Sequence, residues 1–230
     1  MDVMRVSTMR NWLLLLTSVA GVVQAAPPAR IEVAYELSRD GSVVAEVVEV
    51  LEHGGGRYQI TETSRGKGLL AFAGTIKRTS RGVADAKGVR PLEYLDERPG
   101  RNSRAAFDWQ ARTISMQHKA EQKSVPMPDG VQDRLSFMLA FALFPPKEKA
   151  FTYHVADGRG LSEQRYRVVG REKVKTPAGE FTALKLVRSK EKENTEIWLA
   201  AELGYFPVRV SQVPKDGKRL EQTAVRVSVP

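Results

Sequence analysis

At residues 223–229 the chain reads TAVRVSV, and at residues 206–211 it reads FPVRVS. In both stretches residues of one character recur at every second position, which is the period of a β-strand with one buried face. The stretch VAEVVEV at residues 44–50 adds a run rich in β-branched residues, which favour strands. These stretches predict a mainly β protein.

Turn signals recur between the strand-like stretches. Glycine pairs with aspartate or proline at Asp40-Gly41, Pro99-Gly100, Asp157-Gly158 and Asp216-Gly217. Short strands separated by such turns indicate an antiparallel meander. We therefore expect a curved sheet, barrel, half-barrel or roll, and no alternation of strands and helices of the nucleotide-binding type.

One segment, 131–144, has the composition of a helix. Asp129 stands where an N-cap residue is expected, Gln132 follows three residues later, and Pro145-Pro146 ends the segment. The segment is apolar on nearly all faces, which predicts a buried helix lying across the open side of the sheet. Its Phe and Met side chains either line a hydrophobic ligand groove or simply pack in the core.

Residues 1–25 have the layout of a cleavable export signal. Arg5 and Arg10 precede an apolar run of about a dozen residues, which is short for a membrane span, and Val23-Gln24-Ala25 resembles a cleavage site. The start is Met1 or Met9. We expect a periplasmic protein with one β-rich domain over residues 26–230 and no transmembrane segment in the mature chain. Two small domains joined at 119–128 are the alternative.

Composition excludes several classes of function. The 230 residues include no cysteine, which excludes disulfides, thiolate metal sites, thiol catalysis and a lipid-anchored lipoprotein. The net charge of +9 is spread along the chain and aromatic residues make up only 7%. A nucleic-acid-binding surface would combine a basic patch with aromatic residues, so nucleic acid is not an expected partner. The charge suits either solubility or contact with anionic envelope surfaces.

The sequence offers no catalytic motif. The histidines at positions 53, 118 and 154 lack metal-ligand spacing, and no nucleophile elbow surrounds a serine. Carboxylates such as Asp96-Glu97 are interpreted as solvent-facing. We predict no catalytic residues, no metal site and no cofactor.

Several segments in a fixed order resemble a bacterial family of exported envelope proteins, the domain of unknown function 3108. The matching segments span most of the mature chain and include Ile31–Leu37, Gly66-Lys67-Gly68, Pro91–Tyr94, Phe107-Asp108-Trp109, Asp133-Arg134-Leu135-Ser136, Asp157-Gly158-Arg159, Gly170-Arg171-Glu172, Thr176–Phe181, Thr195–Ala200 and Pro207–Val210. The resemblance implies an antiparallel β fold and a periplasmic location. It implies no activity and no established site residues.

Three hypotheses about function follow. The first is a non-enzymatic binding or carrier protein for a lipid or other hydrophobic envelope molecule, with Arg134 and Arg159 meeting an anionic head group. The second is an assembly protein that contacts an envelope protein through its surface or a strand edge. The third is an enzyme, to be checked at His154, Asp157 and Asp133. The candidate ligand-binding residues are Asp133, Arg134, Phe137, Phe141, Asp157, Arg159 and Trp198.

Overall fold

The computed structural model describes residues 28–145, 148–190 and 193–229; the predicted export signal lies outside these residues. Within them, fifteen strands form one sheet in the order β8-β7-β6-β5-β4-β3-β2-β1-β15-β14-β13-β12-β11-β10-β9. The prediction of a mainly β protein built as an antiparallel meander is confirmed.

The first half of the sheet is built from consecutive hairpins. Its strands are β1 (Arg30–Arg39), β2 (Ser42–Gly54), β3 (Arg57–Gly66), β4 (Thr75–Asp85), β5 (Gly88–Arg98), β6 (Arg101–Asp108), β7 (Thr113–His118) and β8 (Glu121–Pro126). A short 3-10 helix, η1 (Gly68–Ala73), connects β3 to β4.

The second half contains the α-helix and the remaining strands. Its elements are β9 (Gln132–Asp133), α1 (Ser136–Leu143), β10 (Ala150–Ala156), β11 (Leu161–Thr176), β12 (Gly179–Lys190), β13 (Glu193–Ala200), the 3-10 helix η2 (Ala201–Leu203), β14 (Phe206–Val213) and β15 (Leu220–Ser228).

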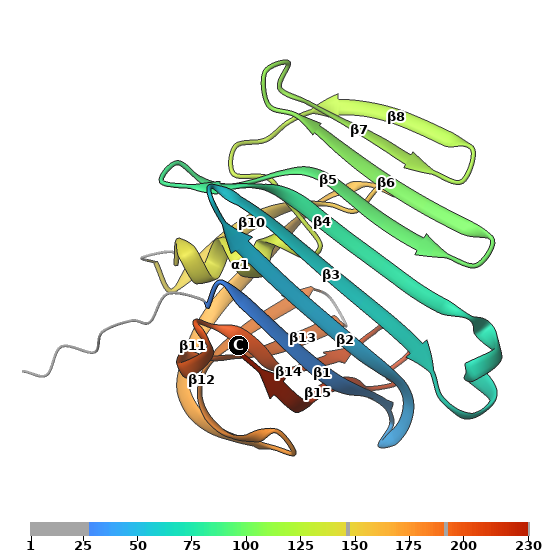
Figure 1. The fold of residues 1–230 in the computed structure, drawn as a ribbon, viewed down its shortest axis with the longest axis vertical. Coiled ribbons are helices and arrows are strands. Elements are labelled where there is room, and N and C mark those ends of the chain that lie inside the picture. The colour runs from blue at the N-terminus through green and yellow to red at the C-terminus, as the bar shows by residue number, and fades with distance from the viewer. Residues whose placement is uncertain (1–27, 146–147, 191–192, 230) are drawn as a thin grey trace, which may run out of the picture.

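The two halves join where β1 pairs with β15, so the first and last strands lie together in the middle of the sheet. The outer strands are β8 and β9, and β9 runs parallel to β10. Because β8 and β9 do not pair, the sheet is curved but open, and the expected alternative of a closed barrel is wrong. Figure 1 shows β2–β8 as a broad layer, with the C-terminal strands curling away from it and α1 in the space between.

Contacts of the turn between β10 and β11 stabilise the curl of the C-terminal strands toward β6 and β8. Lys123 of β8 donates a hydrogen bond from Nζ to the carbonyl oxygen of Arg159 at 2.6 Å. Gly158, with φ of +81°, lies so close to β6 that a Cβ atom there would come within 2.7 Å of the backbone nitrogen of Arg104. These contacts bring the C-terminal strands back onto β6 and β8 without closing the hydrogen-bonded ladder.

The helix begins later than the sequence predicts. It spans Ser136–Leu143 rather than 131–144, because Gln132 and Asp133 pair with β10 as strand β9. The predicted cap is also wrong: Asp129 is exposed and binds Arg112. Asp133 caps the helix instead, since its Oδ1 accepts hydrogen bonds from the backbone N–H groups of Leu135 and Ser136 at 2.8 Å.

The helix is buried as expected and lies between the two halves of the sheet. It contacts β5, β9 and β14. Leu139 and Phe141 are each 2% exposed, and the Phe141 ring packs against Phe151 and Tyr205. Beside Leu139 and Ala142 the space left between the helix and the sheet is only about 10 Å³, which is room for one water molecule at most.

Candidate functional site

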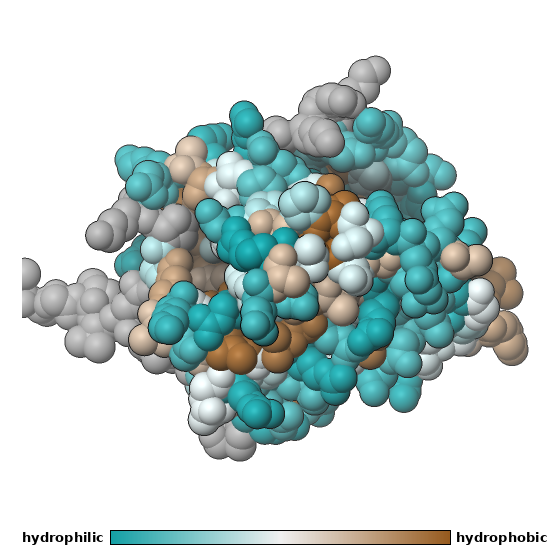
Figure 2. Space-filling model, turned by 90° about the horizontal axis from the view of Figure 1, so that it is seen from above, coloured by the Kyte–Doolittle hydropathy of each residue, from teal (hydrophilic) through white to brown (hydrophobic). Residues whose placement is uncertain are grey.

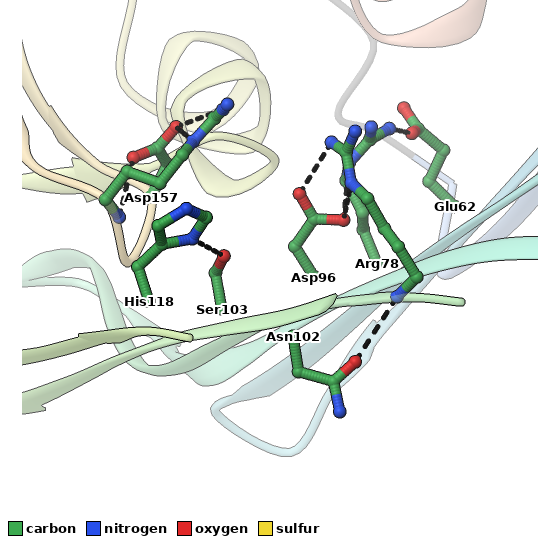
Figure 3. Close-up of polar contacts among 9 residues, drawn as sticks. Glu62, Arg78, Asp96, Asn102, Ser103, His118 and Asp157 are labelled. Atoms are coloured by element: carbon green, nitrogen blue, oxygen red, sulfur yellow. Dashed lines mark hydrogen bonds and ion pairs between the residues drawn. The ribbon is translucent and has the colours of Figure 1, made fainter. Parts of the chain in front are cut away.

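A row of polar side chains crosses the concave face of the sheet. Strand register places each residue opposite the next, from β2 to β7: the row consists of Glu49, Glu62, Arg78, Asp96, Ser103 and His118. We call it the polar row. Figure 3 shows five of its members and the bonds between them. Four of its members, Glu49, Arg78, Asp96 and Ser103, are at most 9% exposed.

Charges in the middle of the polar row compensate one another. Arg78 is bound to Glu62 and lies 3.4 Å from Asp96, which also accepts two hydrogen bonds from Arg98. Burial alone would raise the pKa of Asp96, but the Arg98 hydrogen bonds and the Arg78 charge outweigh it and lower the pKa. The prediction that Asp96 faces solvent is therefore wrong, since it is 3% exposed.

Glu49 at the end of the row behaves differently. Burial, and secondly the charge of Glu62, raises the pKa of Glu49 to about 8. Its carboxyl group is therefore mainly protonated at neutral pH and can donate a hydrogen bond.

A cleft of about 250 Å³ opens beside α1, next to the Glu49 end of the polar row. One wall carries Arg134, Phe137 and Met138, and the other carries Tyr166 and Arg188. With Glu49 protonated and Glu62 bound to Arg78, the two arginines give the cleft a positive charge. The cleft therefore combines an apolar wall with two cationic groups, which suits an amphipathic anion.

The two arginines of the cleft differ in hydrogen bonding and exposure. The guanidinium of Arg188 donates to Thr195 Oγ1 at 3.1 Å, while its buried Nε has no hydrogen-bond partner among the described residues. Arg134 is exposed. Burial raises the pKa of Tyr166 to about 12, against the lowering effects of the charges of Arg188 and, more weakly, Arg134. Phe137 stacks on the Tyr166 ring, with centroids 5.9 Å apart. The aromatic pair is thus fixed, and Arg188 has a hydrogen bond left to give.

The structure brings together two of the predicted site residues, Arg134 and Phe137, in the cleft. Asp133 and Phe141 lie behind them and are 0% and 2% exposed. Asp133 accepts a hydrogen bond from Ser80 Oγ at 2.5 Å in addition to capping the helix. Burial raises the pKa of Asp133 to about 6. Through these hydrogen bonds Asp133 connects the start of α1 to β4.

The other three predicted residues lie elsewhere. Asp157 and Arg159 bind each other in the β10–β11 turn, at 2.7 Å. Trp198 follows Ile197, which lines the cleft, and therefore points to the opposite face of β13. There its ring lies 4.7 Å from Lys185 Nζ, and its Nε1 donates to Glu172.

At the far end of the polar row a serine meets a histidine. Ser103 Oγ and His118 Nδ1 are 2.7 Å apart. A hydrolytic triad would also need a carboxylate that orients the histidine. Asp157 lies beside this pair in Figure 3, but its carboxylate accepts hydrogen bonds from Arg159 and from the backbone N–H of Gly160. We therefore interpret this contact as structural: the buried Ser103 hydroxyl has its hydrogen-bond partner in His118 on the neighbouring strand.

A larger depression, of about 740 Å³, surrounds the β2–β3 turn. Two of its cations are already paired, Arg30 with Glu52 and Arg81 with Glu93. We favour the smaller cleft because neither Arg134 nor Arg188 has an ion-pair partner among the described residues, and because the cleft adjoins the buried polar row. In the part of the chain that the structure describes, no group of three or more His, Asp or Glu side chains is arranged to hold a metal ion. No helix among the same residues is long and apolar enough to cross a membrane.

Sequence reasoning missed the polar row and the Arg188 side of the cleft. One signal was present: Glu49 stands between Val47 and Leu51 at an inward-facing position, where an apolar residue is expected. Arg188 carries no such signal, because its place opposite Arg134 depends on the curl of the sheet.

A search of the curated proteins returned no match. A family model does match the chain over residues 31–223, and its description is "Protein of unknown function (DUF3108)". Because the match covers most of the chain, the resemblance seen in the sequence is confirmed, and the protein belongs to the DUF3108 family of proteins of unknown function.

Proposed function

We propose that this protein is a non-enzymatic binding protein for a small amphipathic anion of the cell envelope, and that it works in the periplasm after removal of residues 1–25. The observation that carries the proposal is the cleft beside α1, where Arg134 and Arg188 face the apolar wall of Phe137 and Met138. The periplasmic location is supported by the N-terminal sequence and by the resemblance to a family of exported proteins.

The size of the cleft limits the range of ligands that it can hold. At about 250 Å³ it is slightly smaller than typical pockets for drug-sized molecules. The space of about 10 Å³ beside Leu139 is too small to hold an acyl chain. The proposed ligand therefore places its anionic group and the first part of its chain in the cleft.

Native mass spectrometry tests this proposal. The protein is isolated gently, delipidated, and offered octyl phosphate, with octyl glucoside and inorganic phosphate as probes that lack the charge or the chain. We expect octyl phosphate to bind in a one-to-one complex and the other two probes to bind at least tenfold more weakly. Failure of the protein to take up octyl phosphate would overturn the proposal.

Two variants separate the cleft from the rest of the surface. Arg188→Met keeps the side-chain volume but removes the charge, and should weaken octyl phosphate binding by about tenfold or more, since a charge-assisted hydrogen bond is lost. Arg159→Met removes a cation of the β10–β11 turn and should leave binding unchanged. Equal effects of both variants would point to nonspecific attraction.

An assembly role is the second candidate function, and one feature favours it. Strand β8 forms an end of the sheet, and four of its six residues in succession, Glu121–Ser124, are exposed. Its free edge could accept a strand from an envelope protein. Cross-linking in cells from Gln122→Cys would recover a specific partner under this hypothesis, while the binding proposal predicts none.

A further inference from the structure

The connection between β3 and β4 exposes large apolar side chains at its tip. In η1, Leu69 is 91% exposed, Phe72 is 92% exposed and Leu70 is 50% exposed. The other exposed large hydrophobic side chains of the described residues are only 42–51% exposed. A single exposed apolar residue is ordinary on a protein surface, but three together at a projecting tip indicate a binding surface.

The backbone of this tip is held in place. Lys67 N–H donates to the carbonyl oxygen of Val44 at 2.8 Å, and Leu70 N–H donates to that of Lys67 at 3.1 Å. Gly66 is required here, because a Cβ atom would lie 2.2 Å from the Leu70 carbonyl oxygen. At the other end, Gly74 has φ of +78° and packs against Pro99. The apolar side chains therefore project from a backbone segment that is already ordered, which lowers the entropic cost of binding.

Cations surround the tip at this end of the sheet. Strand register brings the turns β1–β2, β5–β6, β7–β8 and β14–β15 to the same end as η1, and Figure 1 shows the first three along one side of the molecule with η1. With one flanking residue on each side, these turns and the η1 connection carry eight basic and three acidic residues, so their net charge is 8 − 3 = +5. The basic residues are Arg39, Lys67, Arg98, Arg101, Lys119, Lys215, Lys218 and Arg219, and the acidic residues are Asp40, Glu121 and Asp216.

The cations are not all equally available. Lys67 is paired with Glu36 and Glu46, Arg39 with Asp216, and Arg98 with Asp96. Counting the three further acids of these pairs, Glu36, Glu46 and Asp96, lowers the net charge to 8 − 6 = +2. The positive excess therefore comes mainly from the neighbouring turns. In Figure 2 the view from above is mostly hydrophilic, with apolar groups at the right-hand margin, the side on which η1 lies in Figure 1.

The shape and charge of this end favour a membrane over a protein as its partner. A stable protein interface buries about 800 Å² on each partner, whereas three side chains at a tip supply only a few hundred Å². A short apolar wedge ringed by cations is the composition of segments that enter the headgroup region of anionic bilayers.

We propose that η1 is a membrane-docking tip: Leu69 and Phe72 insert into the interface of a bilayer containing anionic phospholipid, while the cations of the neighbouring turns meet the headgroups. This inference stands on the exposed tip and does not depend on the ligand cleft.

Vesicle sedimentation tests the proposal. The purified protein is mixed with vesicles of phosphatidylethanolamine and phosphatidylglycerol, and wild type is compared with Leu69→Ser/Phe72→Ser and with the control Leu92→Ser. Leu92 is 47% exposed on β5, outside the tip. Any contribution of residues 1–27 is common to all variants. We expect the double variant to bind at least about a hundredfold more weakly, because each buried side chain contributes about ten- to hundredfold, and the control to change less than about twofold.

A second variant measures insertion directly. Phe72→Trp should show a blue-shifted emission on vesicle addition, and brominated lipids should quench it, whereas Leu92→Trp should show neither effect. Wild type that stays off vesicles, or a double variant that binds them as well as wild type, would overturn the proposal. Dimerisation that depends on the tip without vesicle binding would assign the tip to a second copy of the chain and would also overturn it.

Discussion

The two sides of helix α1 differ sharply in the volume of open space between the helix and the sheet. On the Leu139 side the helix and sheet leave a space of about 10 Å³, and its lining side chains are mostly apolar apart from Glu49. On the Arg134 and Phe137 side a cleft of about 250 Å³ remains, lined by charged and polar groups. The helix therefore seals one part of the concave face and forms a wall of the other.

This difference explains why a completely apolar helix does not imply an apolar ligand tunnel. Leu139, Ala140 and Phe141 of α1 are buried by packing, whereas Phe137 and Met138, near its N-terminal end, face the cleft. Asp133 determines that division, because it fixes where the helix begins and binds it to Ser80 of β4. The following predictions test the comparison between the packed side and the open side.

Truncation of the packed side should have the largest effect. Leu139→Ala removes a side chain that is 2% exposed and should lower the free energy of unfolding by about 3–4 kcal/mol. Met138→Ala is the matched change at a side chain that lines both the cleft and the packed space, and it should cost only about 1 kcal/mol because Met138 is already partly exposed. Urea denaturation measures both, and equal costs would contradict the division into a packed and an open side.

Loss of the helix cap should be nearly as large. Asp133→Ala leaves Ser80 and two backbone N–H groups without their acceptor, and should cost about 3 kcal/mol. Asp129→Ala removes the residue that the sequence pattern predicts as the cap and should cost less than about 0.5 kcal/mol. If the two changes had equal effects on urea denaturation, the cap assignment would be wrong.

The pH dependence of stability should reveal Glu49. Its pKa is raised to about 8 in the folded state, so between its ordinary pKa and 8 the folded protein holds a proton that the unfolded chain has lost. Stability should therefore fall as pH rises from about 5 to about 8.5. We expect roughly 2 kcal/mol of this fall from Glu49, less than the full shift implies because the cleft admits water.

Glu49→Gln should remove that part of the pH dependence. The variant keeps the shape of the side chain, and Asp133, whose pKa is raised to about 6, provides the same background in both proteins. Unfolding curves at pH 5 and pH 8.5 measure the difference. A Glu49→Gln protein with the same pH slope as wild type would show that the carboxyl is ionised throughout this range.

The smallest effect is expected at the β10–β11 turn. Arg159→Met breaks its ion pair with Asp157 but leaves the Arg159 carbonyl that accepts from Lys123. The cost should stay below about 1 kcal/mol, since the pair is partly exposed. A thermal shift of more than a few degrees would mean that the side chain itself, and not the backbone of the turn, holds the curl.

Local pattern predicted much of this fold and part of the site. Period-two stretches and glycine turns predicted the antiparallel meander, and an apolar run ended by two prolines predicted the helix. The helix start was missed because residues 132–133 pair with β10, a contact that local sequence does not encode. Arg134 and Phe137 were found because they lie in the predicted helical segment 131–144, although only Phe137 is in α1 and Arg134 is in the turn before it.

The rest of the site depends on long-range register. The polar row places one residue on each of six strands, and no local spacing relates Glu49 to His118. Trp198 was a candidate because it lies in the segment Thr195–Ala200 that resembles the family, but a strand shows alternate residues to opposite faces, and Ile197 is the residue that lines the cleft. Only the curl of the whole sheet brings Arg188 opposite α1.

The most direct test of the cleft is an NMR titration of the isotope-labelled protein with octyl phosphate below its micelle concentration. The account predicts saturable shifts in the backbone amides near Arg134, Met138 and Arg188, with little change around Ala178, in the turn between β11 and β12. Saturable shifts confined to the β2–β3 turn around the larger depression, or no saturable shifts at all, would contradict it.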